Sequence, residues 1–281
     1  MKFSLVVATY GRKKELNILF DSFDNQTYKN FEVIIIDQNE DDYVKRLYEE
    51  YKDKFIIKYI HSDEKGLSKA RNKGLKYVDG DIIAFPDDDC EYKYNFLYDI
   101  LDTFKNNENL NIVTCMSMDK EKDIMSNGKW LKKSVDINFM NVFKTAISYT
   151  IFIKYRNIND IVFDEKLGVG AAWGSGEETD MVLNLLHRNY IGLYNHRLVV
   201  YHPYKNVDIN RAFNYALGYG ALVKKEVFIR RNLVFILNVF KDILAKPIIG
   251  MLLSLITLNS YKGMIYKQNF CGRIYGFVSY R

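Results

Sequence analysis

Short apolar runs alternate with amphipathic stretches along the first part of the chain. Five runs have the length and aliphatic character of buried parallel strands, at residues 2–8, 31–36, 55–60, 82–85 and 112–116. The stretches between them place apolar side chains at helical spacing, at residues 13–23, 41–52, 69–77 and 94–104. Strands that alternate with helices form βαβ units. We therefore predict an α/β fold with a Rossmann-like, mostly parallel central sheet flanked by helices.

The pattern becomes less regular after residue 118. Residues 119–141 are polar and irregular, and a loop of this length inside a compact domain is usually functional or mobile. Residues 144–154 and 197–201 return to strand character, whereas residues 177–188 have the spacing of a helix. We predict that a first domain covers residues 1–205.

Residues 206–281 differ in composition from the rest of the chain. Residues 205–281 hold 12 lysines and arginines against 3 acidic residues, whereas residues 1–204 hold 28 against 32. These basic residues flank two apolar runs, and the longer charge-free run, at residues 247–261, has only 15 residues, which is short for a membrane-spanning helix. We expect a helical appendage that lies on a membrane surface, the alternative being a helical layer packed on the domain.

The amino-acid composition indicates which partners the protein could bind and in which cell compartment it would occur. The apolar content of the basic region is mainly aliphatic, whereas single-stranded nucleic acid is bound by aromatic side chains between basic groups, so we expect no nucleic-acid partner. The three cysteines, Cys90, Cys115 and Cys271, form no CxxC pair, which favours a reducing compartment. The apolar run at residues 3–8 is too short for the core of a signal peptide.

Three adjacent carboxylates, Asp87, Asp88 and Asp89, follow the apolar run at residues 82–85. In an open α/β sheet, ligands bind beyond the carboxyl ends of the strands, where this cluster would lie. Hard divalent cations take oxygen ligands and commonly bridge to a phosphate of the substrate, so the cluster is a candidate site for Mg or Mn. The alternative is a solvated acidic turn.

Five motifs in order carry a resemblance to a known family. They are Val6-Val7-Ala8-Thr9-Tyr10-Gly11-Arg12, Val33-Ile34-Ile35-Ile36-Asp37, Gly66-Leu67-Ser68-Lys69-Ala70-Arg71-Asn72-Lys73-Gly74, Phe85-Pro86-Asp87-Asp88-Asp89, and Trp173-Gly174-Ser175-Gly176-Glu177-Glu178-Thr179-Asp180. Together they span residues 3–203, and the chain resembles the family 2 glycosyltransferases. That resemblance implies a GT-A fold and an inverting enzyme that uses a nucleotide-diphosphate sugar as donor.

The resemblance also implies roles for the acidic cluster. The family's Asp-x-Asp motif maps onto Asp87 and Asp89, so Asp89 is expected to bind the metal, Asp87 to lie near the metal and the donor, and Asp88 to face the donor. His202 would return to the metal or to the diphosphate, as a C-terminal histidine does in similar enzymes. A buried histidine with satisfied hydrogen bonds is the alternative for His202.

Four further residues are expected to bind the donor by the same resemblance. Thr9 and Arg12 follow the first strand, Asp37 ends the second, and Arg71 lies one turn into the helix after Gly66. The family often has a second Asp after the position of Asp37, and Gln38 stands there instead, which leaves the nucleobase open. Surface positions are the alternative for Arg12 and Arg71.

The second acidic cluster supplies the expected base. An inverting transfer requires a group that takes the proton of the attacking hydroxyl, and the family's base maps onto Glu178, where Glu replaces the usual Asp. Asp180 is the second candidate, although acidic residues here would also stabilise a helix N-terminus. Trp173 and Gly174 are expected to contact the acceptor, against the alternative of a core tryptophan.

These observations lead to one functional hypothesis and two rivals. We expect an inverting, metal-dependent transferase that moves a sugar from a nucleotide-diphosphate sugar to a glycan or lipid-linked acceptor in bacterial cell-envelope polysaccharide or glycolipid synthesis. Its expected location is the cytoplasm, at the inner face of the cell membrane. The rivals are a sugar nucleotidyltransferase and a non-catalytic, membrane-associated sugar-binding subunit.

Overall fold

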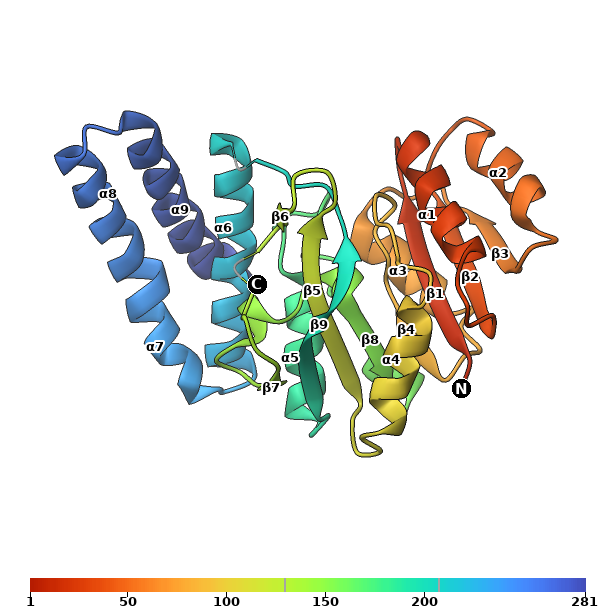
Figure 1. Cartoon of the computed structure of the whole chain (residues 1–281). Coiled ribbons are helices and arrows are strands. Elements are labelled where there is room, and N and C mark those ends of the chain that lie inside the picture. Colours follow the sequence, from red (N-terminus) through yellow and green to blue (C-terminus); the bar gives the residue numbers. More distant parts are fainter. Residues whose placement is uncertain (129, 207) are drawn as a thin grey trace. The chain divides into compact units, whose positions relative to one another are not determined.

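The computed structural model describes residues 1–128, 130–206 and 208–281 (Figure 1). Half of its central sheet is parallel and comprises β1 (Phe3–Thr9), β2 (Phe31–Asp37), β3 (Ile56–His61) and β4 (Ile82–Ala84) in the order β3-β2-β1-β4. The register pairs Thr9 with Asp37, so the carboxyl ends of β1 and β2 meet at one edge of the sheet. This half matches the predicted βαβ pattern.

The other half of the sheet is mixed. The strand β8 (Ile151–Lys154) runs antiparallel to both of its neighbours, β4 and β5 (Ile112–Asp119). Beyond it, β5 pairs in parallel with β9 (Gly192–Tyr201), which also pairs with the short β7 (Val135–Ile137), while β6 (Ile124–Met125) pairs back onto β5. Only residues 151–154 of the strand expected at 144–154 are extended, because Ser148–Thr150 form a 3-10 turn.

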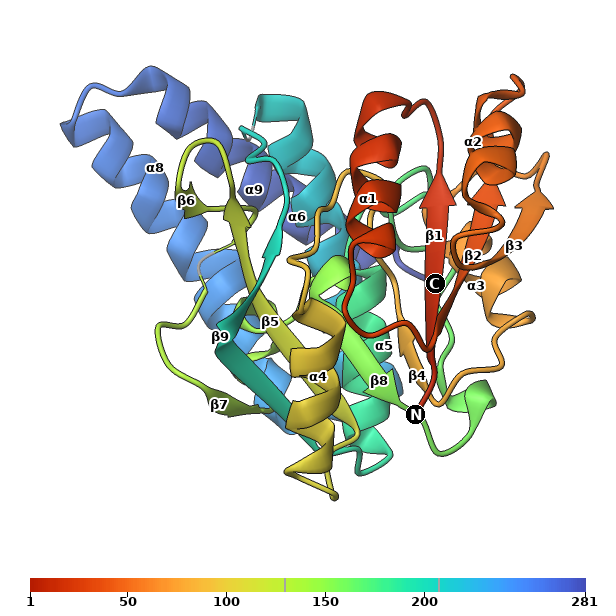
Figure 2. The same ribbon diagram turned by 45° about the vertical axis from the view of Figure 1, so that its right-hand side comes forward.

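Helices cover both faces of the parallel half. The apolar stripes of α1 (Lys14–Asp24), α2 (Tyr43–Tyr51) and α4 (Phe96–Lys105) share one core with β1 and β2, and α1 and α4 lie on the same side of the sheet (Figure 2). The opposite face receives α3 (Leu67–Leu75), where a Cβ on Gly74 would lie 2.4 Å from Val6 Cγ1. Glycine at this position therefore allows α3 to approach the sheet closely.

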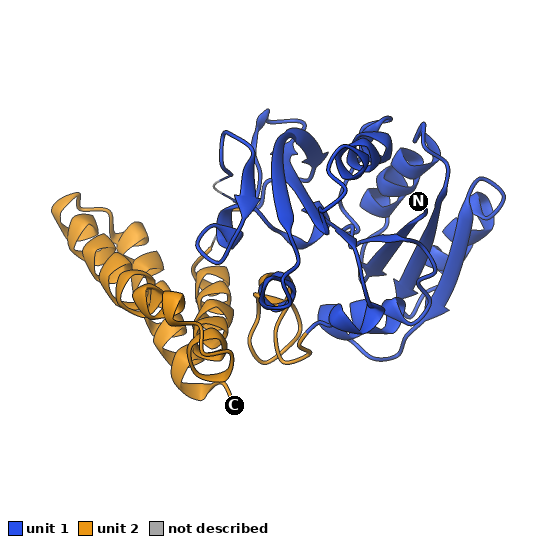
Figure 3. Cartoon of the chain, turned by 90° about the horizontal axis from the view of Figure 1, so that it is seen from below, with its two compact units in different colours: residues 1–163, 181–205 blue, residues 164–180, 206–281 orange. Residues whose placement is uncertain are grey.

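The chain divides into two compact units (Figure 3). Unit 1 comprises residues 1–163 and 181–205 and contains the sheet, and unit 2 comprises residues 164–180 and 206–281. The division falls inside α5 (Glu177–His187), whose first turn belongs to unit 2.

Unit 2 is largely helical. It contains α6 (Ile209–Lys224), a π-helical segment (Lys225–Ile229), α7 (Ile236–Asn238), a second π-helical segment (Val239–Ala245), α8 (Lys246–Ile256) and α9 (Ser260–Ser279). Glycines bring α6 and α9 into backbone contact, since a Cβ on Gly276 would lie 2.0 Å from Leu217 O and one on Gly220 would lie 2.1 Å from Arg273 O. Within the described residues, no helix has the length and apolar content needed to cross a bilayer.

Candidate active site

The acidic cluster lies where several strand ends of unit 1 meet. Asp87 follows β4 and forms a bridge with Ala8 near the end of β1. The last residue of β9, Tyr201, forms a second bridge with Glu91, so the chain after β9 returns to the loop after β4. This pairing brings His202 to the carboxylates, although the two segments are far apart in sequence.

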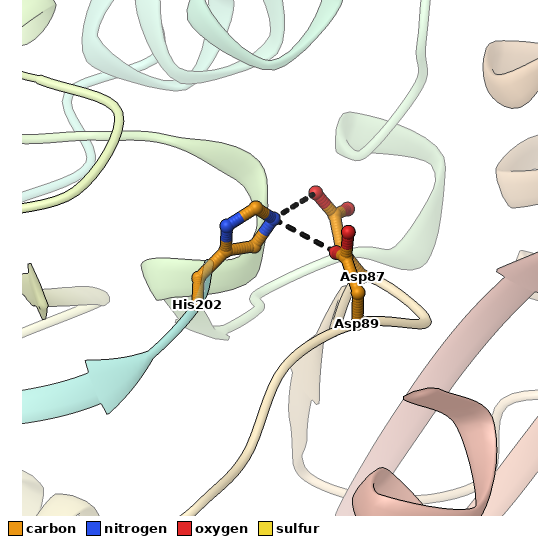
Figure 4. Close-up of side chains that lie close together, drawn as sticks. All are labelled: Asp87, Asp89 and His202. Atoms are coloured by element: carbon orange, nitrogen blue, oxygen red, sulfur yellow. Dashed lines mark ion pairs between the residues drawn. The ribbon is translucent and has the colours of Figure 1, made fainter. Parts of the chain in front are cut away.

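Asp87, Asp89 and His202 form a candidate cation site (Figure 4). One ligand atom from each lies within 4.8 Å of the others. His202 Nε2 is 2.8 Å from Asp89 Oδ1 and 3.9 Å from Asp87 Oδ2. The other ring nitrogen, Nδ1, lies 2.8 Å from the carbonyl oxygen of Pro203 and 2.8 Å from the side-chain nitrogen of Asn127.

This donor set fits a divalent cation. Two carboxylates and an imidazole are common ligands of Mn and of similar ions, and a ligating histidine usually has its second ring nitrogen against a carbonyl or carboxylate, as His202 has Nδ1 against the Pro203 carbonyl. The side chains of Asp89 and His202 are only 3% and 2% exposed. A solvated acidic turn, the alternative considered for the cluster, does not describe a carboxylate buried to this degree.

Basic side chains surround the same carboxylates. Asp89 Oδ2 lies 3.0 Å from an Arg12 nitrogen and 2.6 Å from Lys205 Nζ. Burial alone would raise the pKa of Asp89, but hydrogen bonds and charge from His202 and Lys205 outweigh it and hold the pKa well below its usual range. Arg71, which is 1% exposed, donates to Asp87 Oδ1 at 2.8 Å, so the alternative of a solvated position does not apply to it.

Asp88 makes a different contact. Its Oδ2 accepts a hydrogen bond from Thr9 Oγ1 at 2.9 Å. Burial and the charges of Asp89 and Asp87 raise the pKa of Asp88 to about 7, against the opposing influence of Thr9 and Arg12. Two of the three adjacent carboxylates thus face His202, while the third ties the loop to the end of β1.

Asp37 is buried beside the end of β1. Its Oδ1 accepts hydrogen bonds from the backbone and side chain of Asn39, and its Oδ2 accepts one from Tyr59 Oη at 2.9 Å. Burial and the Asp37 charge raise the pKa of Tyr59 to about 12. Gln38 is the residue that departs from the family pattern. Its side chain donates a hydrogen bond to Glu64 O at 2.5 Å and so holds the loop that contains Glu64.

The remaining predicted residues belong to unit 2. Asp180 is 4% exposed, and its oxygens lie 2.8 Å from Lys225 Nζ and 2.9 Å from an Arg230 nitrogen. Glu178, in the same helical turn, is half-buried. Trp173 packs edge-on against Tyr280, and its Nε1 donates to Ser279 Oγ at 3.3 Å.

Gly174, next to Trp173, packs against α6. A Cβ at this position would lie 3.2 Å from Asn214 Cβ. Trp173 and Gly174, which were expected to contact the acceptor, thus pack against other residues of unit 2.

Several residues at the candidate site were not predicted from the sequence. Lys205 and Ser148 contact Asp89 and Asp87, and Asn127 contacts His202 Nδ1. Lys205 follows His202 by three residues, a spacing that a search around the histidine would have covered. Asn127 lies in the irregular stretch at residues 119–141, and Ser148 lies in a stretch that was expected to be a strand but forms a 3-10 turn.

Comparison with known proteins identifies the family. Residues 4–168 match the family described as glycosyl transferase family 2. A curated relative, the minor teichoic acid biosynthesis protein GgaA of Bacillus subtilis, is 28% identical over 178 residues, which cover 59% of this chain and 40% of GgaA. The chain spans 40% or less of the length of the first curated relatives it matches.

Solved structures share the fold. Residues 1–349 of Staphylococcus aureus TarS, in complex with UDP-GlcNAc, align with a TM-score of 0.61 and 18% identity over 98% of this chain and 92% of that one. The mannosyltransferase PcManGT from Pyrobaculum calidifontis, in complex with GDP-Man and Mn²⁺, aligns with a TM-score of 0.68 and 14% identity over 98% and 84%. Because the family match covers more than half of the chain, this protein belongs to glycosyl transferase family 2, and its fold is GT-A.

Proposed function

We propose that the chain is a metal-dependent, inverting glycosyltransferase that moves a sugar from a nucleotide-diphosphate sugar to an acceptor hydroxyl. The observation that carries this proposal is the cluster of Asp87, Asp89 and His202 at the strand ends, with ligand atoms within 4.8 Å of one another. Family membership supports the class of reaction, and the donors bound to the two structural neighbours support a nucleotide-sugar substrate.

Asp89, Asp87 and His202 would hold Mg or Mn. When bound, such an ion acts as a Lewis acid that stabilises the negative charge of the departing diphosphate. Arg12 and Lys205 both reach Asp89 with side chains that are about one-third exposed, so both cations also face solvent. Their positive charge would attract an anionic donor and help to retain its diphosphate.

The other donor contacts follow from positions in the sheet. Asp37 and Thr9 are register partners at the ends of β2 and β1, and Asp37 would accept a hydrogen bond from the ribose or the base. Arg71 would hold the Asp87 carboxylate in place for the metal, since its guanidinium is buried against that carboxylate. Asp88 would hold the loop through Thr9 and face the donor.

Glu178 would act as the general base. An inverting reaction needs a carboxylate that removes the acceptor proton while the hydroxyl attacks the face of the sugar opposite the diphosphate. Asp180 is the weaker candidate, because each of its oxygens already faces a buried cation. Trp173 and Gly174 would form part of the acceptor side, and Trp173 would stack on a sugar.

The acceptor is proposed to be a glycan or a lipid-linked sugar. The likeness to GgaA, a minor teichoic acid biosynthesis protein, supports a role in the synthesis of bacterial envelope polymers. Such a substrate would be met at the cytoplasmic face of the cell membrane.

The test is a donor screen combined with two variants. The protein is incubated with UDP-, dTDP- and GDP-sugars, with Mg, with Mn, or with a chelator, and sugar release is measured. We expect turnover with one nucleotide class and loss of turnover with the chelator. Asp89→Ala should abolish metal-dependent nucleotide binding and turnover, while Glu178→Gln should retain nucleotide binding and lower turnover by about 100-fold or more. Exposed Asp136→Asn is the control.

Each variant tests the role proposed for the residue that it replaces. Near wild-type turnover of folded Asp89→Ala would remove the metal from the proposal. Near wild-type turnover of Glu178→Gln would show that another residue is the general base.

A further inference from the structure

The helix α8 buries its small residues and exposes its large aliphatic ones. It buries the small residues Pro247, Gly250 and Ser254, and Gly250 lies so close to Tyr266 that a Cβ would be 2.4 Å from its ring. Its large aliphatic side chains are exposed instead. We call the following six residues the aliphatic face: Ile249, Leu252, Leu253, Leu255, Ile256 and Leu258.

The aliphatic face is continuous and strongly exposed. At about 100° per residue, its members within α8 cover about 160° of the helix circumference, so they form one side rather than scattered positions. Exposure rises from 54% at Ile249 to 78% at Ile256 and 92% at Leu258. A helix in water normally buries its aliphatic stripe, whereas helices in lipid place small residues between helices and large ones outside. This side therefore has the character of a lipid contact.

Unpaired positive charge lies on the segments that precede and follow α8 in the chain. Arg231, Lys241, Lys262 and Lys267 are exposed, and among the described residues none of them has a carboxylate partner. The two acidic residues among residues 209–281 are already paired, Glu226 with Arg230 and Asp242 with Lys246. The net free charge beside the apolar surface is therefore positive, which complements an anionic surface.

We propose that unit 2 docks onto an anionic lipid bilayer, with the aliphatic face at the boundary of the acyl chains and the four unpaired cations at the headgroups. The attachment is interfacial, because no helix in the described parts of the chain is long and apolar enough to cross a bilayer. A second copy of the chain is a poorer occupant, because symmetric pairing of these faces would bring the same unpaired cations together. The proposal does not rest on the transfer reaction.

Vesicle binding of the full chain tests the proposal without any donor. The protein is sedimented with vesicles of phosphatidylcholine alone or of phosphatidylcholine and phosphatidylglycerol in equal parts. We expect binding to the anionic vesicles that weakens as salt is added. The variant Leu252→Glu/Leu255→Glu/Ile256→Glu should bind at least about 100-fold more weakly, since each buried aliphatic side chain contributes about tenfold or more. Lys262→Glu/Lys267→Glu should weaken binding about tenfold or more.

Matched controls keep these results interpretable. Ile18 on α1 and Tyr98 on α4 are about half-exposed apolar side chains of unit 1, so Ile18→Glu/Tyr98→Glu should bind vesicles like the wild type. Circular dichroism should show the same helix content in all variants, because every altered side chain is exposed. As a second readout, the fluorescence of Leu255→Trp should shift to the blue on anionic vesicles, whereas that of Tyr98→Trp should not.

Three outcomes would overturn the proposal. One is the absence of binding to anionic vesicles. Another is equal loss of binding in the unit 1 control and in the triple variant. The third is concentration-dependent dimerisation in sedimentation velocity that the triple variant abolishes while vesicles bind neither form, which would assign the aliphatic face to a second copy.

Discussion

Replacing Asp180 by Asn should destabilise unit 2 while sparing most of the transfer activity. Asp180 Oδ2 accepts a hydrogen bond from Lys225 at 2.8 Å, and its Oδ1 lies 2.9 Å from Arg230. All three side chains are at least 85% buried, so solvent screens these charges weakly. The substitution keeps the shape of the side chain and removes only its charge.

The magnitude follows from what Asp180→Asn removes and what it leaves. One buried charge-assisted hydrogen bond contributes about 1.5–3 kcal/mol, and the second ion pair adds about 1 kcal/mol. Lys225 keeps Asp164, and Arg230 keeps Glu226, so neither cation is left without a carboxylate. We therefore expect a loss of about 2–4 kcal/mol rather than the larger cost of an unpaired buried charge, about 3–5 kcal/mol.

Tryptophan fluorescence can follow this change in unit 2 alone. The chain has two tryptophans, Trp130 in unit 1 and Trp173 in unit 2, so a Trp130→Phe background leaves only the second as a probe. In urea, a loss of this size should lower the midpoint of unfolding by about 1 M without changing the slope. Exposed Lys262→Gln, also in unit 2, should change the free energy of unfolding by less than about 0.5 kcal/mol.

The same variant separates the two carboxylates considered for the base. If Asp180 is structural, transfer by the folded variant should fall by less than about tenfold, compared with about 100-fold or more for Glu178→Gln. An unchanged urea midpoint together with lost turnover would refute the reasoning and make Asp180 the base.

Two further predictions concern unit 2. Gly276→Ala should lower the free energy of unfolding in urea by about 1–3 kcal/mol or more, because the new Cβ would meet the Leu217 carbonyl oxygen at 2.0 Å. The exposed control Cys271→Ala, on the same helix, should be neutral. Equal stability of the two variants would contradict the close α6–α9 contact. Burial alone would raise the pKa of Asp164, but hydrogen bonds from Lys225 and Tyr280 lower this pKa below the ordinary value of 3.8. The ionised carboxylate therefore stabilises the fold above about pH 4, and this contribution is lost on acidification. The stability difference between wild type and Asp164→Asn should therefore shrink from about pH 6 to about pH 3 in urea titrations, and a difference that grows would show that the sign is wrong.

The alternating pattern of apolar runs and helical stripes was enough to predict the parallel half of the sheet. Three of those strands, β1, β2 and β4, are buried on both faces, and such strands read as continuous apolar runs, whereas β3 at the sheet edge is exposed at both ends. The direction of β8 could not be predicted, because a short buried strand has the same sequence pattern whether it runs parallel or antiparallel. The start of β8 was also missed, since Tyr149 and Thr150 are residue types that favour strands although they form a 3-10 turn here.

The proximity of candidate residues could be predicted where they follow strands directly. Asp87 and Asp89 were placed by the end of β4 and His202 by the end of β9, and the structure brings all three together. Contacts between distant loops had no local signal, as Asn127 and Ser148 show. Lys225 and Arg230 were read only as flanking charges of an apolar region, because nothing in their own neighbourhood indicates the buried Asp180 that they contact.

The position of β8 has a consequence for folding during synthesis. The strands β1 to β4 are complete once residue 84 has emerged, but the open side of β4 pairs only with residues 151–154. At synthesis rates of about 5–20 residues per second, that edge waits roughly 4–14 seconds for its partner. The strand β4 has only three residues, and Pro86 just beyond them cannot donate a backbone hydrogen bond. This edge therefore offers few backbone groups to another unfinished chain, which protects the nascent protein from aggregation on the ribosome.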